Sequence, residues 1–255
     1  MPQDYLSWAA FVACAMAGPA IGMWRRASAE KSPALSGATT TSLRGSVAPL
    51  DRHVIVCTGT GAESWPARLE DDGASLLSRL SKAVSECNNQ KPATERKLRI
   101  KITASDAAST LPGFTDCIVY PEATLVRVHN NDSIATLAAA LTVDPKQGPL
   151  TFPSSVPYPH KLMLICSHMQ RDKRCGKVGP LVVSRAKEMI NGEDDVRVMA
   201  SSHIGGHEFA GTLIAYPRGD WYGHVTTQRV PEILGALEAG PSCALRCFRG
   251  NSFDW

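Results

Sequence analysis

The sequence has little net charge and no concentrated basic stripe. Its 27 lysine and arginine residues nearly balance 24 aspartate and glutamate residues, which leaves a formal charge of +3. Proteins that bind nucleic acid usually gather basic residues on one face or carry a reader motif. The charge balance therefore excludes nucleic acid as the expected partner. The 255 residues suffice for one large or two small globular domains.

The sequence also lacks a C-x-x-C pair and a convincing secretory signal. Its eight cysteines are irregularly spaced, and the only early charge is Asp4, whereas a secretory signal places positive charge before its apolar run. We therefore expect an intracellular, reducing location without a disulfide framework, and both the mitochondrion and the cytosol stay open. For the C-x3-C of Cys243 and Cys247 we expect two small packing residues, with a redox pair as the alternative.

The N-terminal run from Tyr5 to Trp24 contains no charged residue and is long enough to span a bilayer. Alanine dominates this run, and glycine and proline interrupt it, so its insertion energy would be marginal. The stretch that follows, up to Val47, has the composition of a transit peptide or a linker. We therefore place residues 1–48 outside the fold, as a targeting segment, a weak membrane anchor or a linker.

Strand and helix patterns fill the remaining sequence in two similar halves. In the first half, an apolar strand, a helix, an alternating strand, a two-stranded hairpin and a second helix follow one another. These elements start at His53, Ala74, Lys97, Cys117, Thr124 and Asp132. We expect Asp132 to cap the second helix, because an aspartate side chain accepts hydrogen bonds from the first helical amides.

The second half repeats this order. Its strands start at Lys161, Val196, Gly211 and Trp221, and its helices start at Pro180 and Pro231. This order is typical of a thioredoxin-like domain. We therefore predict an α/β protein of two tandem thioredoxin-like domains, at residues 49–145 and 160–255. Five prolines between residues 142 and 159 mark the linker.

Four potential metal ligands gather in the second half. Cys166 and Cys175 form a C-x8-C, and His203 and His207 form an H-x3-H that begins 28 residues later. Cys166 ends a predicted strand, where sites gather in open α/β sheets, and Cys175 lies at a predicted helix entrance, where partial positive charge favours a thiolate. Two thiolates and two imidazoles suit either a tetrahedral zinc ion or an iron–sulfur cluster with two histidine ligands.

Other residues near these ligands have alternative interpretations. His168 completes a C-x-H that is like half of a Rieske signature, so it is a rival ligand, although the H-x3-H already completes the set. Arg171, Lys173, Arg174 and Lys177 crowd one predicted loop. This loop is either simply solvated, or a collar that stabilises a reduced cluster and docks an acidic reductase.

The first half lacks the ligand set. Cys57 occupies the position of Cys166, but no second cysteine follows at the same spacing and no H-x3-H follows the third strand. The Gly59-Thr60-Gly61 sequence fails the phosphate-loop pattern and indicates a tight turn. We therefore expect the first half to act as a scaffold or a docking surface.

At three motifs the second half resembles a known family. The motifs CSHxxRDxRCG, HxGGHxFAG and YPxGDWYGxV are similar to those of the sucrase/ferredoxin-like family, and the resemblance spans about residues 50 to 255. It implies that the C-terminal domain is a thioredoxin-like ferredoxin with a [2Fe-2S] cluster bound by Cys166, Cys175, His203 and His207. Glu208 and Thr212 depart from the family's usual lysine and asparagine, which would alter the surroundings of the cluster but not its ligands.

The resemblance favours an electron-transfer protein, a carrier rather than a catalyst with its own substrate. Its partner would be a redox protein such as a flavin reductase. The C-terminal Phe253-Asp254-Trp255 is similar to the tails by which clients address the cytosolic iron–sulfur assembly machinery. Two alternatives stay open: a thiol–disulfide oxidoreductase and a structural Cys2His2 zinc module. Sucrose hydrolysis is not expected, because no motif places paired carboxylates about a glycosidic bond.

Overall fold

The computed structural model describes residues 43–190 and 195–253. The candidate membrane segment from Tyr5 to Trp24 and the C-terminal Asp254 and Trp255 lie outside the described residues. Within the described ranges, no helix combines the length and the apolar character needed to cross a bilayer.

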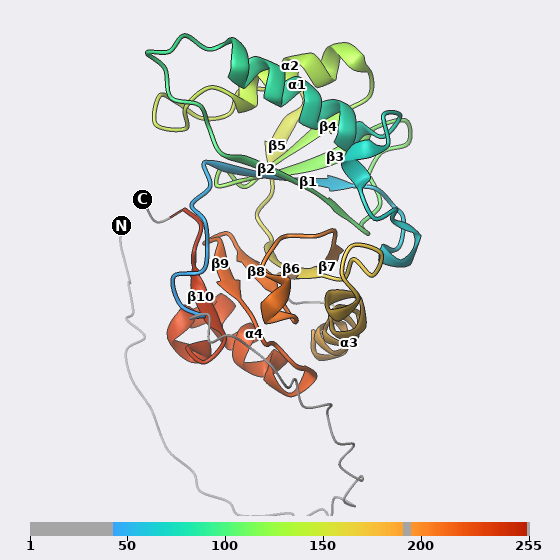
Figure 1. Ribbon diagram of the computed structural model, residues 1–255, viewed down its shortest axis with the longest axis vertical. Coiled ribbons are helices and arrows are strands. Elements are labelled where there is room, and N and C mark those ends of the chain that lie inside the picture. Colours follow the sequence, from blue (N-terminus) through green and yellow to red (C-terminus); the bar gives the residue numbers. More distant parts are fainter. Residues whose placement is uncertain (1–42, 191–194, 254–255) are drawn as a thin grey trace, which may run out of the picture. The chain divides into compact units, whose positions relative to one another are not determined.

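The described residues form one continuous mixed sheet that carries helices (Figure 1). The strands lie in the order β10-β9-β8-β6-β7-β2-β1-β3-β4-β5. The first half contains β1 (Arg52–Cys57), α1 (Leu76–Gln90), β2 (Ile100–Ser105), β3 (Thr115–Tyr120), β4 (Thr124–Val128), α2 (Asn131–Leu141) and β5 (Ser155–Pro157). The second contains β6 (Lys161–Cys166), α3 (Lys173–Met189), β7 (Val196–Ser201), β8 (Leu213–Tyr216), β9 (Asp220–Tyr222), α4 (Val230–Ala239) and β10 (Phe248–Asn251).

The two halves repeat one topology. β1 pairs with β2 in parallel and with β3 antiparallel, and β6 pairs in the same way with β7 and β8. The local orders β2-β1-β3-β4 and β7-β6-β8-β9 are therefore equivalent. The α/β class is confirmed, and the repeated order of elements matches the sequence patterns. That each half is a separate thioredoxin-like domain stays a prediction.

The two halves join at the carboxyl ends of β2 and β7. These strands pair antiparallel only at Ser105 and Ser201. Two side chains extend the junction, because the Ala104 amide donates to Ser202 Oγ (2.9 Å) and the Ala200 amide donates to Asp106 Oδ1 (2.8 Å). Since β6 runs parallel to β7, the end of β6 also lies near this junction.

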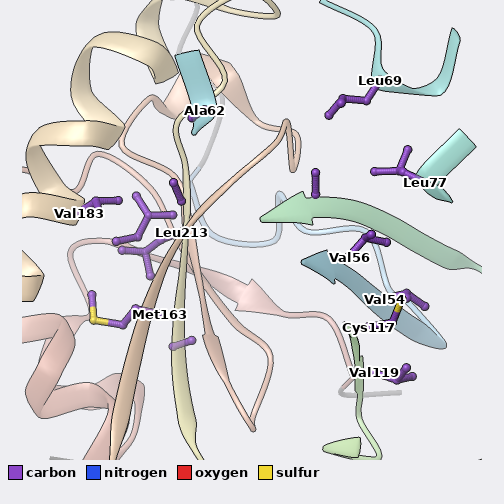
Figure 2. Packing of buried hydrophobic residues seen from close by; sticks show 14 of the residues in the cluster. Val54, Val56, Ala62, Leu69, Leu77, Cys117, Val119, Met163, Val183 and Leu213 are labelled. Carbon is purple, nitrogen blue, oxygen red and sulfur yellow. The ribbon is translucent and has the colours of Figure 1, made fainter. Parts of the chain in front are cut away.

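Side chains alternate between two hydrophobic clusters, as the pleat of a strand requires. Figure 2 shows one cluster, in which Val54 and Val56 of β1 and Met163 of β6 belong with residues of the helices. The intervening residues of the same strands, including Cys57 and Cys166, belong to a second cluster that contains strand residues from both halves. The sequence alternation thus places both cysteines in the second cluster, which also contains Cys175 of α3.

Two helices begin at other residues than the sequence predicts. Helix α3 begins at Lys173 with Asp172 as its N-cap, so Pro180 lies inside the helix rather than in its first turn. The interior position costs a helical hydrogen bond, and tertiary packing compensates because α3 buries Cys175, Gly176 and Gly179. In α2 the N-cap is Asn130, whose side chain accepts from the Ser133 amide, and not Asp132.

The sequence ahead of β1 and the proline-rich link are more structured than expected. The Gly45 amide donates to the carbonyl of Arg249 (2.8 Å) and the Leu50 amide to that of Ser252 (2.8 Å), so residues 43–50 run beside β10 (Figure 1). We expected residues 1–48 to lie outside the fold. The described part of that segment, residues 43–48, belongs to the fold instead. Within the link, β5 adds to the edge of β4.

Asp51, just ahead of β1, ties the first half together. Its buried carboxylate accepts hydrogen bonds from the Arg99 amide (2.6 Å) and from Arg96 Nη1 (2.7 Å). Burial alone would raise the pKa of Asp51, but the hydrogen bonds from Arg99 and Arg96 outweigh it and lower the pKa. The charged form is therefore the form that the fold stabilises.

Replacing Asp51 by alanine should lower the free energy of unfolding at neutral pH by about 2 kcal/mol, because hydrogen bonds to a charged group are lost. Since the pKa is lowered on folding, this contribution is present above the ordinary value of about 4 and disappears as pH falls through the lowered value. Urea unfolding at pH 7 and pH 3 measures it. The exposed Asp71→Ala is the control and should stay within about 0.5 kcal/mol. An Asp51→Ala deficit that is equally large at pH 3 would contradict the assignment.

Candidate metal centre

Cys166 and Cys175 are brought together by close packing of α3 on β6. Cys166 is the last residue of β6, and Cys175 lies in the first turn of α3; both are fully buried. Gly179 permits the approach, because a Cβ there would lie 2.1 Å from the carbonyl oxygen of Cys166. Glycine at this position therefore sets how near the helix comes to the end of the strand.

The two buried thiols shift each other's pKa in opposite directions. The hydrogen bond from Cys175, followed by contributions from His203 and the Ile204 amide, lowers the pKa of Cys166 well below its usual range despite burial. Donating this hydrogen bond, together with burial, raises the pKa of Cys175. Of the two cysteines, Cys166 is therefore the one whose surroundings favour the thiolate. A thiolate is the form that binds metals.

His203 and His207 follow β7 and approach the cysteines from the neighbouring strand. Their ring centroids lie 5.4 Å apart with an interplanar angle of 37°. Gly205 and Gly206 between them have φ values of +104° and +68°, which only glycine adopts readily, so the tight loop expected from the sequence is present. The Nδ1 atom of His203 is buried without a hydrogen-bond partner among the described residues.

The four candidate ligands lie at one edge of the sheet, as two pairs. Cys166 is paired in register with Ser201 of the parallel strand β7, so both ligand loops leave the same end of the sheet. His203 also hydrogen bonds to Cys166, which links the two pairs. Within residues 43–190 and 195–253, however, no three His, Cys, Asp or Glu side chains gather closely enough to hold a single metal ion.

His168 makes a different contact. Its Nε2–H donates to the carbonyl oxygen of Pro66 (2.9 Å), and its ring packs edge-on against Trp65 at 5.7 Å. Burial lowers the pKa of His168. The rival ligand is thus engaged with a loop of the first half, which sequence spacing could not indicate because Pro66 and His168 are distant in the chain.

The basic residues do not share one loop. Lys173, Arg174 and Lys177 lie on α3, and only Arg171 precedes the helix. Arg171 pairs with Glu70 of the first half (3.7 Å), and Arg174 pairs with Asp172 (2.8 Å), a hydrogen bond that lowers the pKa of Asp172 to about 2. The expectation of a basic loop is therefore wrong in its position: most of this charge lies at the start of a helix.

The remaining cysteines of interest lie apart from this pair. Cys243 is exposed, whereas Cys247 is buried and accepts a hydrogen bond from Arg229 Nη1 (3.0 Å); neither forms a disulfide. Cys57, at the equivalent position of the first half, faces the shared cluster of both halves. Burial raises the pKa of Cys57 to about 11, so it stays a neutral thiol.

Comparisons with known proteins match most of the chain. A sequence model of the family described as Sucrase/ferredoxin-like matches residues 43–250. Altered inheritance of mitochondria protein 32 from Debaryomyces hansenii is 38% identical over 96 residues, which are 35% of each chain. The protein of the same name from Candida glabrata is 25% identical over 257 residues, 78% of each chain. Actin patches distal protein 1 from Saccharomyces cerevisiae is 34% identical over 90 residues, 29% of each chain.

The matched stretch thus spans about a third of the length of the Debaryomyces relative. Among solved structures, the thioredoxin-like [2Fe-2S] ferredoxin from Aquifex aeolicus is 19% identical and covers 35% of this chain and 89% of its own. The TM-score of 0.29 is too low to support a statement about the fold or the site.

The packing of α3 on β6 predicts opposite effects for two helical glycines. Gly179→Ala should lower the free energy of unfolding by about 1–3 kcal/mol, because the new methyl group overpacks against Cys166 and Ser167. The matched control is Gly235→Ala in α4, where a Cβ meets only Cys243 at 3.9 Å. It should be neutral or stabilise by up to about 1 kcal/mol through helix propensity. Urea unfolding of both variants is the measurement, and equal effects would show that α3 and β6 are not in close contact.

Proposed function

We propose that this chain, which belongs to the sucrase/ferredoxin-like family, is an electron-transfer protein whose cofactor is a [2Fe-2S] cluster. Its ligands would be Cys166, Cys175, His203 and His207. The observation that carries the proposal is that the fully buried Cys166 and Cys175 lie at the end of β6, beside the β7 strand from which His203 and His207 follow. Cys175 and His203 both lower the pKa of Cys166. Thiolate and imidazole are the donors that iron–sulfur centres with mixed ligands use.

The arrangement of the donors supports two metal ions better than one. A structural zinc ion needs four donors around a single point, whereas the described donors come as a cysteine pair from β6 and α3 and a histidine pair from the loop after β7. A centre of the Rieske type assigns two cysteines to one iron and two histidines to the other. The unpartnered Nδ1 of His203 provides a free donor atom in the histidine pair.

When bound, such a cluster accepts and releases one electron, and histidine ligands raise its potential above that of an all-cysteine site. The protein residues hold and shield it. Burial of both cysteines excludes water, and the Ile204 amide donates to Cys166, which stabilises negative charge on that sulfur. Hydrogen bonds of this kind tune the potential of a cluster.

The surroundings also support a class of partner. Lys173, Arg174 and Lys177 at the start of α3, next to Cys175, offer positive charge for an acidic redox protein such as a flavin reductase. Delivery of the cluster by the cytosolic assembly machinery through the C-terminal Trp255 is part of the proposal. Relatives named for altered inheritance of mitochondria support a role connected with that organelle.

A thiol–disulfide oxidoreductase is the second candidate. The opposite pKa shifts of Cys166 and Cys175 favour it, because a thiolate beside a second thiol can form and resolve a mixed disulfide. Both sulfurs are fully buried, however, and a substrate disulfide would need access to one of them. Metal-free protein that reduces disulfides would favour this candidate over electron transfer through a cluster.

Replacement of a proposed ligand should change the iron content and the potential in a predictable way. Cys166→Ser should lose most of its iron, sulfide and visible absorbance, because a hydroxyl is a poor substitute for the thiolate. His203→Cys and His207→Cys should keep a cluster of lower potential, because thiolate replaces imidazole. Iron and sulfide analysis, absorbance and redox titration are the measurements.

The exposed Cys243→Ser is the control and should retain about two irons and two sulfides per chain, as the wild type should. A Cys166→Ser protein with full absorbance would overturn the ligand assignment. One zinc per chain in the colourless wild-type protein would instead favour a structural zinc module.

A further variant separates the two halves. Cys57→Ala should leave the iron content unchanged, because the Cys57 thiol is neutral and the first half carries no ligand pair. Iron analysis of the purified variant beside wild type is the test. Loss of iron, with the circular dichroism spectrum preserved, would mean that the two halves share one site.

A further inference from the structure

A small cavity adjoins the loop that joins His203 and His207. Its volume is about 190 Å³, and its lining includes Val47, Lys101, Gly205, Trp221 and Arg249. These residues come from both halves and from the segment that runs beside β10. Ligand pockets for drug-sized molecules have volumes of about 300–1,000 Å³. This cavity therefore fits a group of a few heavy atoms, or one end of a larger molecule.

Arg249 brings a buried cation to the cavity without a carboxylate partner. Its residue surface is 3% exposed, and its Nε and Nη2 atoms donate only to the hydroxyl and carbonyl oxygens of Ser46 (3.0 and 3.1 Å). Its Nη1 atom has no hydrogen-bond partner among the described residues. Burial lowers the pKa of Arg249, while the charge of Glu208 raises it without forming a salt bridge among the described residues.

Gly206 allows this guanidinium to lie against the loop. A Cβ at Gly206 would come within 2.4 Å of Arg249 Nη1, so any other residue would displace the cation. The guanidinium carbon also lies 4.8 Å from the ring centre of Phe209 and 5.5 Å from that of Trp221. The aromatic rings fix its position but do not supply the negative charge that a buried cation requires.

Lys101 provides a second cation in the lining of the cavity. It is half-buried, and burial lowers its pKa, whereas the charge of Cys166 raises it. Across the described parts of the chain, the Lys101 ammonium makes neither a salt bridge nor a hydrogen bond. One lysine and one arginine side chain thus line the small cavity. Neither forms an ion pair with a described residue. Buried charges are normally paired.

Further hydrogen-bond donors face the same space. The indole Nε1 of Trp221 is buried without a partner in the described residues. The amides of Gly205 and Gly206, which also line the cavity, donate to no described residue. Successive amides in turns with positive φ form concavities that bind anions. Residues that line the cavity therefore carry hydrogen-bond donors without a partner among the described residues.

We propose that this cavity is a binding site for a small oxyanion, a phosphate or carboxylate group held between Arg249 and Lys101. Charge-assisted hydrogen bonds from the two cations would supply most of the affinity. The Trp221 indole and the glycine amides would complete the coordination. The site is separate from the four proposed cluster ligands, and its occupation does not require a cluster.

Calorimetric titration of the full-length purified protein with inorganic phosphate and with acetate tests the site, with iron content recorded on the same sample. Wild type should bind at least one of the two anions at one site per chain with a Kd below about 1 mM. Lys101→Met should weaken that binding by about tenfold or more, because one charge-assisted hydrogen bond is lost. Trp221→Phe, which keeps the ring and removes its donor, should weaken it less.

The matched control is Lys97→Met, which removes the same charge from the first half. Lys97 does not line the cavity, and its ammonium donates to Asn89. Its affinity should stay within about twofold of wild type. Binding of phosphate alone would identify a phosphate group, and binding of acetate alone a carboxylate. The proposal is overturned if wild type binds neither anion, if Lys101→Met binds as wild type does, or if Lys97→Met weakens binding equally.

Discussion

Close contact between α3 and the end of β6 is the constraint on which the site depends. A backbone carbonyl can lie this near a helix only if the helix residue facing it has no side chain, and Gly179 meets that condition. The approach places Cys175 within hydrogen-bonding reach of Cys166 and keeps both sulfurs out of water. Parallel pairing of β6 with β7 then brings His203 to the same edge. Helix packing therefore sets the cysteine pair, and strand pairing sets the position of His203.

Equivalent cysteines in the two halves have opposite acid–base properties, and their partners explain the difference. Cys57 and Cys166 both end the first strand of their half and both face the cluster between the halves. Among the described residues Cys57 accepts a hydrogen bond from the Ser105 hydroxyl alone (3.8 Å), so burial dominates and its pKa rises. Cys166 receives hydrogen bonds from a thiol, an imidazole and an amide, which outweigh burial and lower its pKa. Repetition of the backbone topology therefore does not repeat the chemistry.

Positive charge around the site comes from distant parts of the chain. Lys101 belongs to the first half and Arg249 to β10, and both lie by the loop between the two histidines. The charge of Cys166 raises the pKa of Lys101, although burial outweighs it. The first half is thus more than a support for the second. It contributes a cation to the surroundings of the thiolate, and its Pro66 carbonyl fixes the His168 ring.

The sequence by itself determined the α/β class, the repeated order of strands and helices, and the residue types of the proposed ligands, because periodicity and spacing are local properties of the chain. It placed the start of α3 at Pro180 and the cap of α2 at Asp132, and both errors have a local cause. Proline favours the first turn of a helix, but buried packing of Cys175, Gly176 and Gly179 extends α3 upstream of Pro180. Aspartate favours a cap, but in α2 Asn130 takes the capping position. Only the tertiary structure decided that the pKa of Cys166 is lowered, that His168 turns to Pro66, and that Lys101 and Arg249 share a cavity. These outcomes depend on contacts between residues far apart in the chain, and neither propensity nor spacing encodes such contacts.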